Sequence, residues 1–334
     1  MNEWTYEKAG VSLQRADAFV EYIKERVKTL KKQALLFGSF ASGISLEGFR
    51  NPLLMMTTDG VGTKLKIAQE VGIHHTVGID LVAMNINDIL TTGAKPLAFL
   101  DYIAVGKIEP HILNRVMDGI VEGCRIADVA LVGGETAEMP DFYPEGVYDL
   151  AGFCVGACEK EELVTGKDIK PGDVIIGLPS SGFHSNGYSL IRKILRSRGI
   201  DYRDSFEGSD KKIWEILLEP TRIYSKEIEA IKGICQIKGM AHITGGGIGG
   251  NLVRILPEGC KAVVERGKIP NNPIFDWIRD LGNVPMEEMY KTFNMGVGFM
   301  LVVNPQEVDK VLRTIDSSFV CGYIEEGQRD VVIV

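Results

Sequence analysis

The stretch PLLMMTTDGVGTK, residues 52–64, passes from an apolar run into a short polar segment, and the rest of the chain can be organised around it. The apolar run is typical of a core strand, and it ends at Asp59. Two glycines, Thr63 and Lys64 follow before an amphipathic segment begins at Leu65. A carboxylate, unhindered backbone N–H groups, a hydroxyl and an ammonium at a strand end can hold a metal and a phosphate together. Because Asp and Gly also dominate ordinary turns, a plain strand–turn–helix junction stays open for this stretch alone.

The composition is that of a globular protein larger than one domain. The chain has 334 residues, of which 45% are hydrophobic and 25% charged, so two domains are expected. The net charge of -8, without a basic cluster, argues against a surface for nucleic acid or anionic membrane. No apolar run of about 18 residues could span a membrane, and the first residues contain no apolar signal core. We therefore expect a cytoplasmic protein that binds neither nucleic acid nor membrane.

The cysteines and histidines show no spacing typical of a metal site. Six cysteines are scattered without a C-x-x-C pair, and the five histidines include no H-E-x-x-H motif. Buried free thiols in a reducing compartment are the simplest interpretation.

Further polar residues follow or interrupt apolar runs in the first half of the chain. In the predicted helix 81–92, Asn85 and Asp88 are three residues apart and share a face. A solvated polar stripe stays open there. Asp101 interrupts the strand-like run 96–105, where a carboxylate needs a partner or a proton. The stretch VALVGGETAE, residues 129–138, repeats the pattern of strand, glycines and carboxylate with Glu135 and Thr136, so these carboxylates could converge on one cation.

The second half begins after a polar stretch at residues 159–170, where the turn signal Pro171-Gly172 follows. We place the domains at residues 1–165 and 166–334. Strands and helices alternate without a strict β-α-β rhythm, which favours an α+β fold with two layered domains over a doubly wound sheet.

Two loops of the second half are candidate ligand sites. The stretch PSSGFHSNG, residues 179–187, precedes a predicted helix, and its hydroxyls, His and Asn suit an anion or a ribose. Helix capping explains one or two of these residues but not all. Gly245, Gly247 and Gly250 match the dinucleotide fingerprint G-x-G-x-x-G, yet no repeated β-α-β units surround them, so nicotinamide binding is disfavoured.

Seven motifs occur together and in order: DGVGTK (59–64), GIDLVAMNIND (78–88), FLDY (99–102), VGGETAEMP (132–140), SSGFHSNGY (180–188), PTRIY (220–224) and HITGGG (242–247). Together they strongly resemble the phosphoribosylformylglycinamidine cyclo-ligase (aminoimidazole ribonucleotide synthetase) family of purine biosynthesis. The resemblance covers nearly the whole chain. It implies an ATP-dependent ligase that closes the imidazole ring of formylglycinamidine ribonucleotide through an iminophosphate. It also implies a homodimer whose N-terminal domains form a shared β-barrel beside a C-terminal domain with a mixed sheet.

On this resemblance we expect three groups of site residues. Mg²⁺ would be held by Asp59, Asp88 and Glu135. The catalytic groups would be Lys64 against the transferred phosphoryl group, and His184 or Asp101 for proton movement. ATP or the substrate would contact Gly38, Phe40, Gly60, Gly62, Thr63, Asp80, Asn85, Thr136, Ser181, Ser185, Asn186, His242 and Thr244.

One segment departs from the family pattern. Members usually carry a glycine-richer loop where this chain has FGSFASG, residues 37–43, and a Cβ at Ser39, Ala41 or Ser42 limits close backbone approach. The alternatives are a thiamine-monophosphate-kinase-like ATP enzyme and a non-catalytic nucleotide-binding dimer. The first lacks the His-Ser-Asn-Gly loop in this form, and the intact carboxylates argue against the second.

Overall fold

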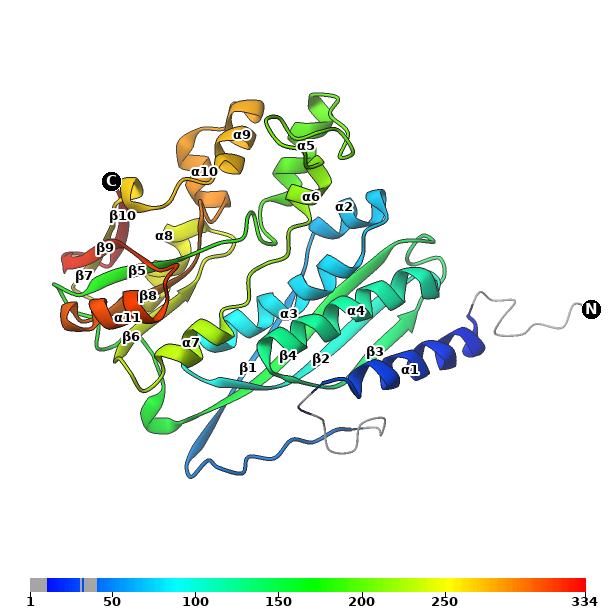
Figure 1. Cartoon of the computed structure of the whole chain (residues 1–334), viewed down its shortest axis with the longest axis horizontal. Helices are drawn as coiled ribbons and strands as arrows, with labels where there is room; N and C mark the ends of the chain where they lie inside the picture. The colour runs from blue at the N-terminus through cyan, green and yellow to red at the C-terminus, as the bar shows by residue number, and fades with distance from the viewer. Residues whose placement is uncertain (1–10, 31, 33–40) are drawn as a thin grey trace, which may run out of the picture.

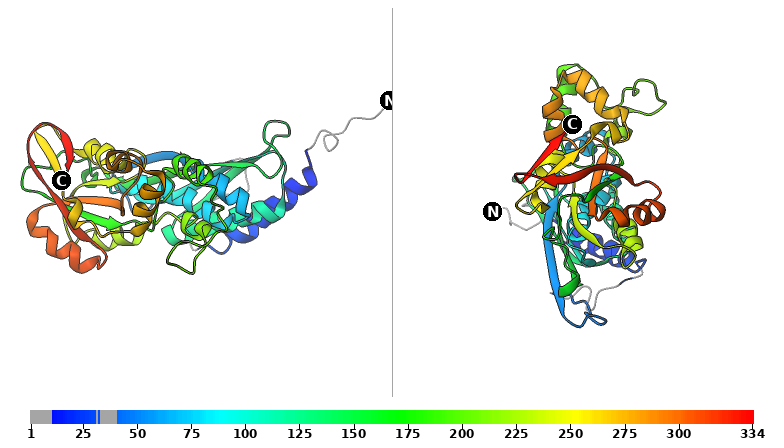
Figure 2. Two further views of the ribbon diagram at one scale, coloured as in Figure 1. Left: turned by 90° about the horizontal axis from the view of Figure 1, so that it is seen from above. Right: turned by 90° about the vertical axis from the view of Figure 1, so that its left-hand side faces the viewer.

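The structure is a computed structural model that describes residues 11–30, 32 and 41–334. Its two parts lie at opposite ends of an elongated molecule, as Figures 1 and 2 show. Each part contains one sheet with helices packed on it, so the expected two-domain α+β fold is confirmed in its coarse form. The predicted boundary between residues 165 and 166 lies in the connection between the sheets and stays a prediction.

The N-terminal sheet has the strand order β1-β4-β2-β3, in which β2 and β3 are parallel and the other pairs are antiparallel. Its strands are β1 (Pro52–Gly60), β2 (Lys95–Val105), β3 (Ala130–Glu138) and β4 (Tyr148–Glu159). The helices are α1 (Leu13–Val27), α2 (Lys64–Val71), α3 (His75–Leu90) and α4 (Pro110–Ala127). Helices α3 and α4 cover one face of this sheet (Figure 1).

The close packing of α3 on α4 depends on glycines. A Cβ at Gly119 would lie 1.8 Å from the carbonyl oxygen of His75, and one at Gly78 would lie 2.3 Å from that of Val116. The helix backbones therefore approach closer than larger residues allow. This contact fixes α3, which carries Asp80, Asn85 and Asp88.

The opposite face of the same sheet is apolar but exposed. Leu54 and Met56 on β1 are 47% and 58% exposed, and Tyr102 on β2 and Phe153 on β4 are 41% and 39% exposed. These four side chains alternate with residues that point toward the helices, as the two-residue period of a strand requires. Ile44 packs against Ala98, Ala130 and Val132 of this face, and the four side chains beside them stay partly exposed.

The C-terminal sheet has the order β10-β7-β9-β5-β8-β6, with β7 and β10 parallel. Its strands are β5 (Val174–Pro179), β6 (Ile237–His242), β7 (Cys260–Val264), β8 (Val297–Val303), β9 (Phe319–Glu326) and β10 (Asp330–Ile333). The α-helices are α5 (Tyr188–Ser197), α6 (Ile213–Leu217), α7 (Ser225–Ile231), α8 (Gly247–Leu252), α9 (Pro273–Gly282), α10 (Met286–Thr292) and α11 (Val308–Thr314). Short 3-10 turns are η1 (Lys160–Glu162), η2 (Val253–Ile255), η3 (Arg266–Lys268) and η4 (Pro305–Glu307).

The two parts share one apolar core. A single cluster of buried side chains includes Phe99 of the first sheet, Phe299 of the second, and Tyr224 between them. Helix α3 packs against both α7 and β6. The site residues on α3 therefore face the C-terminal part directly.

The glycine-rich segment at residues 245–250 does not form a dinucleotide site. Strand β6 before it pairs only with β8, in antiparallel fashion, so no parallel β-α-β unit surrounds the glycines. Gly247 has a φ of +62°, and a Cβ there would lie 1.7 Å from the carbonyl oxygen of Tyr290. The glycine thus serves the packing of α8 against α10.

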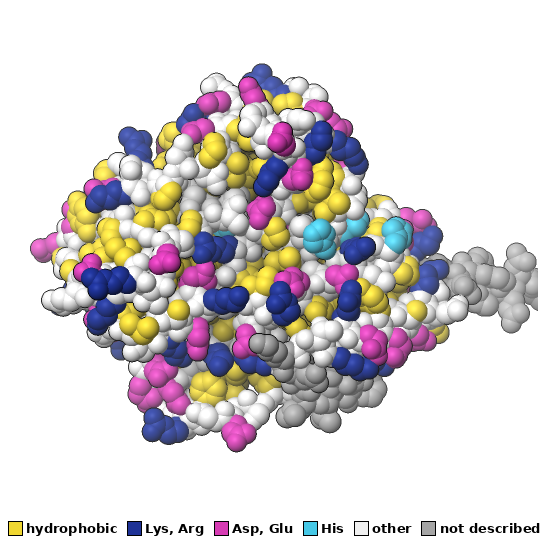
Figure 3. All heavy atoms as spheres, in the orientation of Figure 1, with side chains coloured by type: hydrophobic (Ala, Val, Ile, Leu, Met, Phe, Trp, Pro, Cys, Tyr) yellow, Lys and Arg dark blue, Asp and Glu magenta, His cyan; other side chains and the backbone are white. Residues whose placement is uncertain are grey.

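Helix ends differ from the predicted ones. The predicted helix 13–32 ends at Val27, and the predicted helix 81–92 begins already at His75. No helix among the described residues is long and apolar enough to cross a membrane. On the face shown in Figure 3, Lys and Arg side chains are interspersed with Asp and Glu, as on an ordinary solvated surface.

Candidate active site

A cavity of about 330 Å³ lies between the two parts of the molecule. Strand β1 and helix α3 line it on one side, and β6, α8 and η2 on the other. Its polar lining includes Thr57, Asp88, His242 and Arg254. We call this cavity the interdomain cleft.

Asp88 and His242 meet across the cleft. The Nδ1 atom of His242 lies 2.9 Å from Oδ1 of Asp88, and the histidine side chain is 2% exposed while the aspartate side chain is 39% exposed. The other ring nitrogen, Nε2, lies 3.5 Å from Nδ2 of Asn87, which can only donate. Nδ1 therefore carries the proton and donates to Asp88. This contact orients the carboxylate and leaves its exposed side to the cleft.

Asp59 lies beside this pair at the end of β1. Its Oδ1 accepts a hydrogen bond from the backbone N–H of Gly60 at 2.7 Å. Burial raises the pKa of Asp59 above its usual value, and the nearby charge of Asp88 raises it further. Two carboxylates that repel one another beside a cleft favour a bound cation between them.

Asn85 leaves a buried oxygen without a partner in the same region. Its Nδ2 donates to the carbonyl oxygens of Leu81 at 2.9 Å and Asp59 at 3.3 Å. Its Oδ1 has no hydrogen-bond partner among the described residues, although it is buried. An orphaned amide oxygen near two carboxylates is a further ligand of the kind that Mg²⁺ accepts.

The residues present fit Mg²⁺ only in company with phosphate oxygens. Among the described residues, no three His, Cys, Asp or Glu side chains lie close enough to form a metal site. Protein sites for Mg²⁺ commonly use one or two carboxylates and take the remaining ligands from substrate phosphates and water. Asp59 and Asp88 satisfy that pattern.

Glu135 does not join them within one chain, contrary to our expectation. It pairs laterally with Tyr102, which pairs with Ala151, which pairs with Gly60. Asp59 is one residue before Gly60, so Asp59 and Glu135 point to opposite faces of the sheet. The sequence pattern identified both strand ends but not this difference in face.

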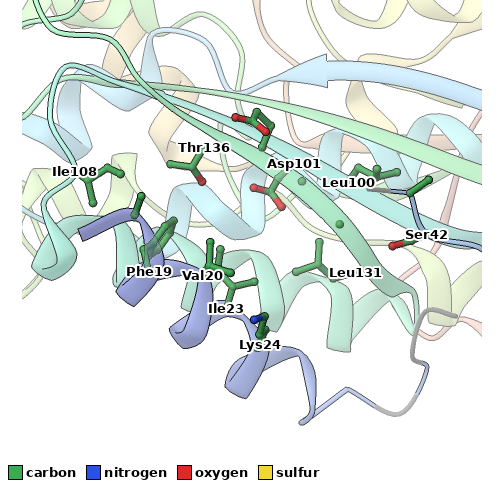
Figure 4. A pocket seen from close by; sticks show the side chains of 15 residues that line it. Phe19, Val20, Ile23, Lys24, Ser42, Leu100, Asp101, Ile108, Leu131 and Thr136 are labelled. Atoms are coloured by element: carbon green, nitrogen blue, oxygen red, sulfur yellow. The ribbon is translucent and has the colours of Figure 1, made fainter. Parts of the chain in front are cut away.

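Asp101 and Thr136 line a second cavity of about 520 Å³, between α1 and strands β2 and β3. Figure 4 shows Asp101 projecting into the space that Phe19 and Ile23 of α1 face. A Cβ at Gly134 would lie 2.5 Å from Oδ1 of Asp101, so the glycine makes room for the carboxyl group. Burial raises the pKa of Asp101 to about 7. Glu135 lines this second cavity as well.

Lys64 does not reach into the interdomain cleft, in contrast to the expected phosphoryl contact. Its Nζ lies 2.8 Å from Oδ2 of Asp80, and it donates to the carbonyl oxygens of Glu219 at 2.7 Å and His184 at 3.0 Å. Both charged side chains are 0% exposed. Burial lowers the pKa of the ammonium, while Asp80 opposes that effect. Three acceptor groups thus occupy its three protons.

Asp80 also holds the C-terminal part rather than a ligand. Its Oδ1 accepts from the backbone N–H of Thr221 at 2.7 Å and from the Thr221 hydroxyl at 2.6 Å. The Thr221 hydroxyl in turn lies 3.0 Å from that of Ser185. One buried network therefore ties α2 and α3 to the loop 179–187.

The loop 179–187 is tightly constrained. His184 has a φ of +58°, and its Nε2 accepts the backbone N–H of Ser181 at 3.1 Å. Its Nδ1 is buried without a partner among the described residues. Burial lowers the pKa of His184 well below its usual value. The ring is therefore neutral with its proton on Nδ1, so it offers a donor and not the proton acceptor that we expected.

The other predicted residues have varied surroundings. Ser181 donates to the carbonyl oxygen of Pro220, Thr63 lies 3.0 Å from the Ser189 hydroxyl, and Thr244 donates to Asn251. Asn186 lies next to Gly245, where a Cβ would come 3.4 Å from its Oδ1. Gly60 is the last residue of β1, and Gly62 lies in the turn that follows with a φ of +71°. Gly38 and Phe40 lie outside the described residues.

Sequence reasoning missed two residues that complete the site. Asn87 receives the backbone N–H of Tyr224 at 3.1 Å and donates to the carbonyl oxygen of Arg222 at 2.8 Å. The position of Asn87 directly before Asp88 could have indicated that it belongs to the site. Arg254 lines the cleft, but nothing in its local sequence marks it.

Comparison with known proteins agrees with these features. Family models of AIR synthase related proteins match the chain over residues 49–158 for the N-terminal domain and 170–334 for the C-terminal domain. The phosphoribosylformylglycinamidine cyclo-ligase of Caldanaerobacter subterraneus subsp. tengcongensis is 48% identical, over 98% of this chain and 99% of its own. That of Myxococcus xanthus is 49% identical, over 99% and 98%. The chain belongs to the phosphoribosylformylglycinamidine cyclo-ligase family. It is accordingly a C–N ligase of purine biosynthesis, as its motifs indicated.

Two solved structures with the same fold are more distant in sequence than these relatives. The thiamine-monophosphate kinase from Stenotrophomonas maltophilia K279a has a TM-score of 0.69 at 17% identity, covering 95% of each chain. The E. coli hydrogenase maturation protein HypE has a TM-score of 0.66 at 14% identity, covering 95% of this chain and 93% of its own. At these identities the likeness shows the fold alone. The sequence relatives therefore decide between the cyclo-ligase and the kinase alternative.

Proposed function

We propose that this cyclo-ligase carries out its chemistry in the interdomain cleft, with ATP activating the formyl amide of formylglycinamidine ribonucleotide. The amide oxygen attacks the γ-phosphorus, ADP leaves and the amide nitrogen loses its proton, which gives an iminophosphate. The amidine nitrogen then attacks the formyl carbon and loses a proton, and phosphate leaves as the ring closes. The observation that carries the proposal is the pairing of Asp88 with His242 across the cleft, beside Asp59.

Asp59 and Asp88 are the residues that would hold Mg²⁺, with Oδ1 of Asn85 in support. When bound, the ion would neutralise charge on the ATP phosphates, which is the main demand of phosphoryl transfer. His242 keeps the Asp88 carboxylate in one orientation, because its protonated Nδ1 donates to Oδ1. Glu135, Thr136 and Asp101 belong to the second cavity, where a carboxyl group with a pKa of about 7 suits proton transfer near neutral pH.

The role of Lys64 is positioning. Its ammonium joins Asp80 to the carbonyl oxygens of His184 and Glu219, so it fixes the loop 179–187 against the N-terminal part. At the end of that loop, the side chain of Asn186 lies beside Gly245, in the segment that follows β6.

The exposed apolar face of the N-terminal sheet supports a homodimer. Leu54, Met56, Tyr102 and Phe153 together would leave a large apolar surface in water, and such surfaces mark interfaces. A second copy of the same face is a self-complementary partner, as a two-fold symmetric interface requires. Two such sheets facing each other would form the barrel-type interface that the resemblance implies.

The experiment that tests the proposal is an assay of phosphate release from ATP. Formylglycinamidine ribonucleotide should produce ADP and phosphate in equal amounts, together with a ring-closed product. Thiamine monophosphate serves as the control and should produce no ADP. ADP formation with thiamine monophosphate alone would contradict the proposal.

A further inference from the structure

We propose that Arg254 binds the 5′-phosphate of the ribonucleotide substrate in the interdomain cleft. This inference rests on the proposed use of the cleft for the reaction. Nothing in the motifs singles out Arg254, which lies in the turn η2 after α8.

Arg254 is the only Lys or Arg among the described residues that line the cleft. Asp88 lines the same cavity and carries the opposite charge, with Asp59 close by. A phosphate dianion that enters beside these carboxylates is repelled unless a cation offsets its charge. The guanidinium group of Arg254 is the group on this wall that can do so.

The guanidinium group is free to take a ligand. The side chain of Arg254 is exposed and makes no ion pair or hydrogen bond with any residue that the structure describes. Other arginines near the two parts' junction are already committed, such as Arg222, which pairs with Glu227 at 2.6 Å. An unpaired guanidinium in a cleft is suited to phosphate, because its planar fork can donate two parallel hydrogen bonds.

The backbone that carries Arg254 is held firmly. Arg329 donates to the carbonyl oxygen of Val253 at 3.1 and 3.2 Å and to that of Arg254 at 3.4 Å. Asn251 ties the preceding turn by donating to the carbonyl oxygens of Gly245 and Gly247. The side chain of Arg254 therefore extends into the cleft from a fixed base, which lowers the entropic cost of binding.

The position of Arg254 favours the substrate phosphate over the phosphates of ATP. Asp59 and Asp88, which we assign to the metal and ATP, belong to the N-terminal wall, whereas Arg254 belongs to the C-terminal wall. The cleft volume of about 330 Å³ is within the range of ligand pockets and is sufficient for a ribose phosphate on this wall. The relatives are named for a phosphoribosyl compound, so their substrate carries a phosphate that could bind the guanidinium group on this wall.

The test measures Arg254→Gln with two ligands, the ribonucleotide and its dephosphorylated riboside. The KM for the ribonucleotide should rise about 10- to 100-fold, as expected for loss of a charge-assisted contact. The KM for ATP should stay within about twofold of wild type. The wild type should bind the riboside about 10- to 100-fold more weakly than the ribonucleotide. Arg254→Gln should show a much smaller difference between the two ligands, because the substitution and the loss of the phosphate remove the same contact. Arg254→Lys, which keeps the charge, should recover part of the loss.

Arg313→Gln is the matched control. It removes the same charge, but Arg313 is exposed on α11, away from the cleft. Its kinetics should equal those of the wild type. Calorimetric binding of the ribonucleotide without ATP gives a second readout that needs no turnover. Equal binding by wild type and Arg254→Gln would overturn the inference, as would a raised KM for ATP alone or an equal loss with the riboside. A wild type that binds no ribonucleotide would instead count against the proposed function.

Discussion

The Lys64 ammonium lies 2.8 Å from Oδ2 and 2.9 Å from Oδ1 of Asp80, and neither side chain is exposed to solvent. The pair joins the first helix after β1 to α3, and the remaining bonds of both residues reach the C-terminal part. An ion pair in such a place is costly to break, because the residue left behind is a buried charge without its counter-charge.

Replacing Lys64 by Met should therefore destabilise the protein by about 3–5 kcal/mol. The variant leaves the Asp80 carboxylate with only the two donors of Thr221. Urea unfolding measures the effect. Lys291→Met is the control, since its pair with Glu287 is 64% and 79% exposed and should change stability by less than about 1 kcal/mol. A Lys64→Met variant as stable as the wild type would show that the pair does not join the two parts.

Asp101 should make stability depend on pH. Burial raises the pKa of Asp101 to about 7 in the folded state, from 3.8, so ionisation opposes folding. The free-energy cost that ionisation of Asp101 adds to folding grows as pH rises from the pKa of the unfolded state to that of the folded state, and it is constant above the folded-state pKa. Asp101→Asn, which cannot ionise, should gain stability relative to wild type by about 2–3 kcal/mol more at pH 8 than at pH 5.

Urea unfolding at both pH values measures this gain. The control is Asp210→Asn, the same exchange at an exposed aspartate that makes no ion pair with a described residue. If the gain of Asp101→Asn were equal at the two pH values, the carboxyl group would titrate as an ordinary aspartate.

His242 should act on turnover through Asp88. His242→Ala removes the donor to Oδ1 and should lower ATP turnover about 10- to 100-fold, as found for residues that orient metal-binding carboxylates. His242→Asn places an amide N–H near the former Nδ1 and should restore most of the loss. The dependence of turnover on Mg²⁺ concentration reports the effect. His111→Ala changes a histidine that is 76% exposed and should have no effect. Equal defects in the Ala and Asn variants would contradict an orienting role.

The apolar face of the first sheet should hold two copies of the chain together. Leu54→Glu places a charge in that face, at a residue that does not line the interdomain cleft, and should convert the dimer to a monomer, measured by light scattering after gel filtration. Met286→Glu is the control, because Met286 is 38% exposed on α10 in the C-terminal part. A wild type that is monomeric, or a Leu54→Glu variant that stays dimeric, would contradict the proposed interface.

Local patterns in the sequence predicted much of the site. The strand, turn and helix around residues 52–71, the shared face of Asn85 and Asp88, and the loop before α5 all depend on neighbours along the chain. Periodicity and turn chemistry suffice for such features. The α+β fold followed from the order of these elements.

The remaining features depend on contacts that no local pattern contains. The partners of Lys64 include the carbonyl oxygens of His184 and Glu219, which are 120 and 155 residues away along the chain. The face on which Glu135 lies depends on the register of β2 and β3, which shifts between Phe99 and Leu100. Arg254 enters the cleft only because α8 and η2 fold back beside β6.

The central claim is that ATP activates the amide oxygen of the substrate, and an isotope transfer tests it most directly. Formylglycinamidine ribonucleotide labelled with heavy oxygen in its formyl amide is incubated with the protein, ATP and Mg²⁺, and the released phosphate is analysed by mass spectrometry. The account predicts that each phosphate formed carries one labelled oxygen, because the amide oxygen leaves with the phosphoryl group. Release of unlabelled phosphate while the ring closes would contradict it.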